Sequence, residues 1–252
     1  MEGEDKSEGE DKQHKMAETK PKATLELFSG TGSFSKVARE MLRDTHAAFL
    51  TLDNDRFFSD NTTFACNILD FKYMAELSPF CITHVWASCP CTQYSVARSK
   101  AKMPRDLEGA DRLVERTLQI IDWIREHNNA EVTFYIENPS HSLLKTRPVM
   151  TERNYPYYDV TYCRYAPEWG LRKSTRIYSN VCEGRFVPKR CLGARLCEAC
   201  IPSPRVQGRY IHKNTPKGRF WLHGEWKSVD DKRRWLGRVP PKLCEGLIRA
   251  SF

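Results

Sequence analysis

The sequence predicts an α/β protein with a mostly parallel sheet, helices on both faces and a small cysteine-rich lobe. Short apolar runs alternate with helical patterns along most of the chain, the order that builds a parallel sheet. Acidic or reactive residues follow the ends of these runs, and from about residue 182 the pattern changes to loops rich in Pro, Gly, Arg and Cys. A chain of 252 residues has room for one substantial domain and an accessory lobe.

The first predicted unit is a strand, a glycine turn and a helix. Ala23–Phe28 is apolar and β-prone, the turn reads Ser-Gly-Thr-Gly-Ser, and Phe34–Leu42 has helical spacing. A second strand, Ala47–Leu52, ends at Asp53. Glycines in such a turn let the backbone approach a ligand closely, so this end of the sheet is a candidate cofactor site.

Two further strands lead into reactive side chains. Thr83–Ala87 runs into Ser-Cys-Pro-Cys, and Val132–Ile136 runs into Glu-Asn-Pro. Between them, Asp106–His127 carries Leu, Val and Ile at the spacing of an amphipathic helix. Because ligands bind beyond the carboxyl ends of parallel strands, we expect Cys91 and Glu137 to share one site.

These patterns divide the chain into four segments. Residues 1–21 are predicted to be a disordered charged tail, since residues 1–20 hold seven acids and four lysines without an apolar face. We expect residues 22–181 to form the main α/β domain with the candidate catalytic residues, 182–236 to form the basic, cysteine-rich lobe, and 237–252 to form a C-terminal helix that returns to the main domain.

Composition and charge limit the setting and the partners. The chain has no apolar run of membrane-spanning length, and its polar N-terminus lacks the apolar core of a secretory signal. We therefore expect an intracellular protein, nuclear or cytoplasmic, with reduced thiols and no membrane contact. The net charge is +8, and nine Lys or Arg against two acids lie between Cys182 and Phe220. This segment suits a nucleic-acid backbone, with a solvated basic loop as the alternative.

The residues around the glycine turn favour a nucleoside without phosphates. Asp53 ends the second strand, where an acid is placed to hold ribose hydroxyls, and Asp70 follows at the next turn. The sequence contains no Gly-Lys-Ser/Thr phosphate loop here, and the acids would repel a pyrophosphate. An adenosyl cofactor fits this pattern better than a nucleotide.

Cys91 is the candidate nucleophile and Glu137 the candidate acid. Cys91 directly follows Pro90, which restricts the turn after a buried strand. A thiolate is suited to adding to an electron-poor carbon and to leaving in a later step. A carboxyl group at the end of the neighbouring strand is placed to donate a proton or a hydrogen bond where negative charge develops.

In this order the motifs resemble those of the carbon-5 cytosine-specific DNA methyltransferase family. Phe28-Ser-Gly-Thr-Gly is similar to the family's first motif, Pro90-Cys91 with Tyr94-Ser95 to its nucleophile motif, and Glu137-Asn138 to its Glu-Asn motif. Asp53 and Asp70 match its cofactor acids, and the segment from Val239 to Ile248 resembles its last motif. The resemblance covers about residues 23–180 and 237–252.

The resemblance implies a compact methyltransferase with a Rossmann-like fold that acts on duplex DNA, and we expect a monomer. Cys91 would add to carbon 6 of a flipped cytosine, Glu137 with Asn138 would act at N3, and carbon 5 would take the methyl group. The implied S-adenosylmethionine-binding residues are Phe28, Gly30, Gly32, Asp53, Asp70 and Pro90. The same chemistry on transfer RNA and an inactive nucleic-acid-binding module of the same fold are the alternatives.

Two motifs depart from the family's pattern. Cys89 stands where the family has the first proline of Pro-Pro-Cys, which makes it a competing nucleophile. The arginine motif is represented only by Gly-Leu-Arg-Lys-Ser-Thr-Arg, residues 170–176. We assign substrate contact to Arg176, with Arg172 and Arg164 as alternatives.

The cysteines of the lobe are candidate zinc ligands. Cys197-x-x-Cys200 has the spacing of a zinc half-site, and Cys191 with His212 completes a set of four, with Cys182 as an alternative ligand. Reduced cysteines that only pack are the other interpretation. The lobe lies between the arginine motif and the last motif, where the resembled family carries its target-recognition region.

Overall fold

The computed structural model describes residues 19–252 except for 97, 99–101, 129, 194, 204–205, 214–234 and 236. The tail predicted over residues 1–21 therefore lies almost wholly outside the described residues, as does much of the second half of the predicted lobe. Among the described residues, no helix is long and apolar enough to cross a membrane.

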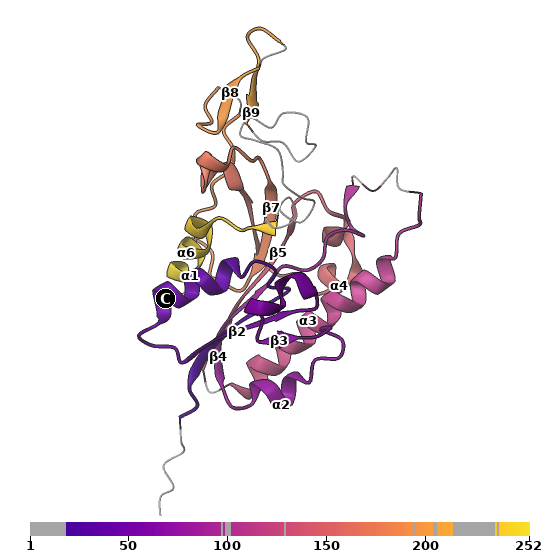
Figure 1. Ribbon diagram of the computed structural model, residues 1–252, viewed down its shortest axis with the longest axis vertical. Helices are drawn as coiled ribbons and strands as arrows, with labels where there is room; N and C mark the ends of the chain where they lie inside the picture. Colours follow the sequence, from indigo (N-terminus) through magenta and orange to yellow (C-terminus); the bar gives the residue numbers. More distant parts are fainter. Residues whose placement is uncertain are drawn as a thin grey trace, which may run out of the picture.

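A seven-stranded sheet forms the centre of the molecule, in the order β3-β2-β1-β4-β5-β7-β6 (Figure 1). Its strands are β1 Lys22–Leu27, β2 Ala48–Asp53, β3 Phe64–Ala65, β4 Cys81–Ala87, β5 Thr133–Pro139, β6 Tyr157–Thr161 and β7 Ser174–Ser179. All neighbours pair in parallel except β7, which is antiparallel to β5 and β6. The strand order reverses between β1 and β4, and in parallel sheets this reversal opens a crevice for ligands.

Helices cover both faces of the sheet (Figure 1). They are α1 Ser33–Leu42, α2 Tyr73–Leu77, α3 Leu107–His127, α4 Pro148–Thr151 and α6 Pro241–Ala250, with the 3-10 turns η1 Arg56–Asn61, η3 Leu143–Thr146, η4 Tyr162–Arg164 and η5 Pro167–Trp169. The predicted mostly parallel α/β fold is confirmed, and the predicted strands and helices are present with ends shifted by a few residues.

Alternating side chains on the central strands build a core on each face. Trp86 and Tyr135 point toward α1 and α6, whereas Val85 and Phe134 point toward α3. Phe34 of α1 stacks on Trp86 with ring centroids 5.3 Å apart. The Tyr135 hydroxyl donates to the Leu247 carbonyl in α6 at 2.9 Å, so the C-terminal helix is fixed to the sheet.

The lobe projects from the end of the sheet (Figure 1). Its described part contains a two-stranded antiparallel hairpin, β8 Cys200–Pro202 and β9 Tyr210–His212, in which Cys200 lies opposite His212. Strands this short are marginal on their own in water, so the hairpin needs support from elsewhere.

Candidate active site

The glycine turn at the end of β1 adopts a left-handed backbone. Gly30 has φ 49° and Gly32 has φ 65°, values that favour glycine. The Gly30 amide donates to Asp53 Oδ2 at 2.7 Å, and Asp53 Oδ1 accepts from the Asp55 amide at 2.8 Å. Asp53 therefore fixes the shape of the turn from the end of β2, while Asp55 lines the neighbouring cavity.

Glu26 is a site residue that the sequence analysis did not single out. Its side chain is buried in β1 and accepts hydrogen bonds from the amides of Phe34 (3.2 Å) and Ser35 (2.8 Å) in the first turn of α1. Burial raises the pKa of this carboxyl to about 7, against the lowering effect of the two amides. The sequence did hold a signal for Glu26, because it is an acid within an otherwise apolar strand.

A cavity of about 790 Å³ opens at the carboxyl ends of β1, β4 and β5. It brings the glycine turn together with the predicted nucleophile and acid. Among its lining residues are Glu26, Phe28, Gly30, Asp55, Pro90, Cys91, Glu137, Arg172, Lys173 and Val239. The Cys91 and Glu137 side chains thus face one space, as their strand positions predict.

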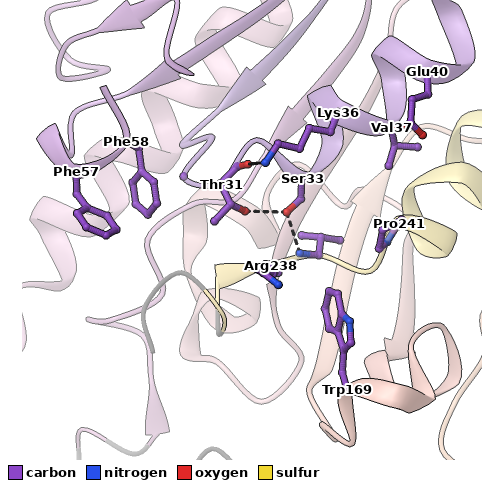
Figure 2. Close-up of a pocket in the computed structure, with 12 residues that line it drawn as sticks. Thr31, Ser33, Lys36, Val37, Glu40, Phe57, Phe58, Trp169, Arg238 and Pro241 are labelled. Carbon is purple, nitrogen blue, oxygen red and sulfur yellow. Dashed lines mark hydrogen bonds between the residues drawn. The ribbon is translucent and has the colours of Figure 1, made fainter. Parts of the chain in front are cut away.

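A second cavity of about 590 Å³ adjoins the first at the N-terminus of α1 (Figure 2). The two share the turn residues Gly30 and Thr31. Ser33 Oγ lies 3.0 Å from Thr31 Oγ1 and accepts from the Val239 amide at 3.2 Å, as Figure 2 shows. The segment before α6 is thereby fastened to the glycine turn and completes the wall.

Cys91 is half-buried on the loop after β4. Its carbonyl accepts from the Tyr94 amide at 3.1 Å, which closes a tight turn around the thiol. Burial raises the pKa of the Cys91 thiol and the nearby Glu137 carboxylate raises it further, whereas Lys173 lowers it. The thiol therefore depends on a local cation to reach its reactive form.

Cys89 occupies a different environment from Cys91. It is 3% exposed and belongs to the core between the sheet and α3. Its Sγ lies 3.8 Å from Thr117 Oγ1 of α3. Burial raises its pKa to about 12. Both cysteines border the cavity, but the greater exposure and the adjacent cation favour Cys91 as the nucleophile.

Glu137 lies near the end of β5, two residues before Pro139, in a buried position and has two partners. Its Oε1 accepts from the Tyr162 hydroxyl at 3.2 Å and lies 3.3 Å from Lys173 Nζ. The Lys173 ammonium also lies 4.8 Å from the centroid of the Tyr162 ring. Neither partner was predicted, because no sequence spacing reports that η4 and the start of β7 meet the end of β5.

Asn138 ties the acid to the nucleophile loop. Its Nδ2 donates to the Cys89 carbonyl at 3.2 Å, and its Oδ1, although buried, has no hydrogen-bond partner within the described part of the chain. Asn138 thus holds the end of β5 against the loop that carries Cys91.

The structure does not bring Arg176 to this cavity. Its guanidinium makes two bonds to Asp159 on β6, at 2.8 and 3.0 Å, and lies 3.6 Å from the centroid of the Tyr157 ring. Of the two alternatives, Arg172 lines the cavity and Arg164 lines a separate, smaller one. Lys173 is the cation that contacts Glu137.

Asp70 also lies apart from the site. It is exposed in the turn after β3 and does not line the cavity, whereas Phe28, Gly30 and Pro90 do. Gly32 shapes the turn through its amide, which donates to the Ser29 carbonyl at 2.7 Å.

The lobe cysteines gather around His212 together with a residue from outside the lobe. Ligand atoms of Cys163, Cys191, Cys197 and His212 all lie within 4.8 Å of one another. Cys191 and Cys197 approach His212 Nε2 at 3.5 and 3.4 Å, while Cys200 Sγ lies 3.4 Å from Nδ1.

Cys163 on η4 is thus a candidate ligand that the sequence analysis missed, because it lies far upstream in the predicted catalytic domain. Cys200 is next to the four-residue group rather than in it, and Cys182 is exposed and not part of it.

Comparisons with known proteins place these features in context. No protein-family model matches the chain. A protein of Frog virus 3 (isolate Goorha) named "Probable DNA (cytosine-5)-methyltransferase" is 31% identical over 240 residues, which is 89% of this chain and 97% of that protein. A methyltransferase of Entamoeba histolytica has a similar fold, with a TM-score of 0.53 at 13% identity over 93% of this chain and 98% of its own.

Proposed function

Because the chain belongs to the DNA (cytosine-5)-methyltransferase family, we propose that it transfers a methyl group from S-adenosylmethionine to carbon 5 of cytosine in DNA. The observation that carries this proposal is the single cavity that Cys91 and Glu137 line together with the glycine turn at Gly30. The nucleophile, the acid and the cofactor end of the sheet therefore face the same space.

Cys91 is the group that adds to the cytosine ring. Its thiolate forms a bond to carbon 6, and the electron pair of the 5,6 double bond moves toward carbon 5. Carbon 5 then takes the methyl group, which S-adenosylmethionine supplies when bound. Loss of the carbon 5 proton to a water-derived base and elimination of the thiolate restore the ring and free Cys91.

Glu137 acts at the N3 side of the base. Tyr162 and Lys173 hold Oε1, so a proton taken up on Oε2 when the base binds can be donated as a hydrogen bond to N3, which offsets the negative charge that develops when the thiolate adds. Lys173 supports both groups, since it pairs with Glu137 Oε1 at 3.3 Å and lowers the pKa of the Cys91 thiol. The proposed substrate contact thus moves from Arg176 to Lys173, with Arg172 beside it in the cavity wall.

The residues around the glycine turn suit S-adenosylmethionine. A cavity of about 790 Å³ has the size of a small-molecule site. Phe28, Gly30 and Pro90 would contact the adenosine part, with Asp55 as the acid for the ribose. We choose Asp55 over Asp53 because Asp55 lines the cavity while Asp53 is bonded to the turn.

Duplex DNA is the proposed partner of the lobe. DNA is the substrate in the viral relative's name, and Arg185, Lys189 and Arg190 are exposed where the chain enters the lobe. Such cations suit phosphate groups. Transfer RNA is the alternative substrate that an experiment has to separate.

Cys163, Cys191, Cys197 and His212, together called the Cys–His cluster, support the binding of a structural Zn²⁺. Thiolates and imidazole are the ligands that structural zinc takes in tetrahedral sites. Cys163, Cys191 and Cys197 would supply three ligands, and His212 or Cys200 the fourth. We expect metal analysis of the full chain to find one Zn²⁺ per molecule, and folded protein without metal would contradict this assignment.

The function is tested by methyl transfer from labelled S-adenosylmethionine to duplex DNA and to structured RNA in parallel, with Cys91→Ala as control. Cys91-dependent label recovered as 5-methylcytosine in DNA is the expected result. Label only in RNA would replace the substrate and keep the chemistry. Bound DNA and cofactor without label in either nucleic acid would identify an inactive binding module.

A further inference from the structure

Two consecutive residues join the Cys–His cluster to the catalytic acid. Tyr162 and Cys163 lie side by side on η4. The buried Tyr162 hydroxyl donates to Glu137 Oε1 at 3.2 Å, and Cys163 belongs to the group of ligand atoms within 4.8 Å of one another. One short helix therefore supplies a contact to each site.

The cluster replaces an apolar core in the described part of the lobe. The buried side chains here are Cys163, Cys197, Ala199 and His212, and Cys191 and Cys200 are partly buried against them. The hairpin strands β8 and β9 have three residues each, too few to be stable alone. Thiols and an imidazole stand in the place of apolar side chains, and these are the ligands by which a structural metal would hold this part together.

Backbone hydrogen bonds make η4 a direct link between the two sites. On the lobe side, the Thr161 amide donates to the Lys189 carbonyl at 3.0 Å, and Thr161 Oγ1 accepts from the Cys191 amide at 3.1 Å. On the catalytic side, the Tyr162 amide donates to the Lys173 carbonyl at 3.0 Å. Displacement of Cys163 would be transmitted to the two residues that contact Glu137.

We propose that Zn²⁺ bound by this cluster anchors Tyr162 against Glu137, and that Tyr162 is a positioning residue for methyl transfer. The inference rests on the proposed function and on the proposed zinc site. With the metal bound, Cys163 holds η4, the Tyr162 hydroxyl holds Oε1, and the Tyr162 ring supports the Lys173 ammonium. Without the metal, η4 loses its link to the lobe cysteines and keeps only its backbone bonds, so that the Tyr162 hydroxyl holds the Glu137 carboxylate less firmly.

Three variants of the full chain test the proposal by kinetics. Tyr162→Phe keeps the ring and the zinc but removes the hydroxyl, and we expect kcat to fall about tenfold or more with an unchanged KM for S-adenosylmethionine. Cys163→Ser should lose the zinc and show a similar loss of kcat. Cys182→Ser is the matched control, because Cys182 is exposed and outside the cluster, and it should keep both zinc and kcat.

A spectroscopic measurement tests the link without turnover. In protein labelled with ¹³Cζ-tyrosine, the resonance missing from Tyr162→Phe identifies Tyr162. Removal of zinc from the wild-type protein by a chelator should shift or broaden this resonance, and added Zn²⁺ should restore it. A Tyr162 resonance that stays unchanged while the metal leaves would overturn the proposal, as would full kcat in Tyr162→Phe.

Failure of the proposed function and failure of the positioning role of Tyr162 give different results. Wild-type protein that binds zinc but methylates nothing would refute the proposed function, and the tyrosine resonance would still report whether the metal controls Tyr162. Active wild-type protein with an equally active Tyr162→Phe would refute only the positioning role.

Discussion

The Asn138 side chain donates from Nδ2 to the Cys89 carbonyl at 3.2 Å, which joins the strand of the acid to the loop of the nucleophile. Asn138→Ala removes this bond, and the loop gains freedom two residues before Cys91. We expect the rate of covalent adduct formation with fluorocytosine-containing DNA to fall about tenfold or more, because misplaced reacting groups lose rate steeply. Stopped time courses of the adduct on denaturing gels measure this rate. An unchanged rate would show that the bond serves folding alone.

Lys173→Met should move the reactivity of Cys91 to higher pH. Burial and Glu137 raise the pKa of the Cys91 thiol while Lys173 lowers it, so removal of the cation raises the pKa further and leaves less thiolate at neutral pH. The alkylation rate of Cys91 by iodoacetamide, followed by mass spectrometry from pH 6 to about pH 10, should show the displaced profile. Lys145→Met, at an exposed position on η3, is the control and should match the wild type.

Cys89 and Cys91 should respond differently to substitution. Cys91→Ala is expected to abolish both methyl transfer and the trapped adduct. Cys89→Ala should keep the adduct and lower the free energy of unfolding by roughly 1 kcal/mol, because it leaves a small gap in the core beside Thr117. An adduct in Cys91→Ala that disappears in the double variant would assign the chemistry to Cys89 instead.

Arg176→Met should weaken the fold more than the chemistry. The change breaks a two-bond contact with Asp159 between β7 and β6, and we expect the free energy of unfolding to fall by about 2 kcal/mol. Urea unfolding followed by fluorescence measures this loss. Methyl transfer below the unfolding transition should stay within a few fold of the wild type. A large loss of kcat in fully folded Arg176→Met would restore the substrate role predicted from its motif.

Glu26 should make stability fall as pH rises toward neutrality. The pKa of its carboxyl is raised to about 7 in the folded protein, above an unfolded value of about 4.3, so between these pH values the folded state holds a proton that the unfolded state has lost. Folding stability therefore decreases with pH across this window, by at most about 4 kcal/mol. The difference in unfolding free energy between wild type and Glu26→Gln, measured from pH 5 to pH 8, should show this slope. A constant difference would contradict it.

The sequence predicts the elements that carry local signals. The strand, glycine turn and helix around Gly30 follow from apolar runs and spacing, and the amphipathic pattern before His127 matches α3 closely. Cys91 and Glu137 meet in one cavity because both follow parallel strands, whose carboxyl ends share an edge.

The partners of these groups were not predictable, because they depend on the antiparallel end of the sheet. Tyr162 and Lys173 lie on either side of the turns between β6 and β7, and nothing in their spacing reports contact with Glu137. Arg176, by contrast, has a motif position but lacks the contact that the motif predicts. Strand alternation points its side chain to Asp159.

The bond from the Val239 amide to Ser33 Oγ also has a consequence for how the protein is made. On the ribosome the chain emerges from its N-terminus, so Cys91, Glu137 and the whole sheet are synthesised well before Val239. A nascent chain therefore carries its reactive thiol for some time before the cofactor wall can close. Closure of the cavity therefore comes late in biosynthesis, and a frameshift or stop codon between positions 91 and 239 would remove Val239 from the wall while leaving the thiol in place.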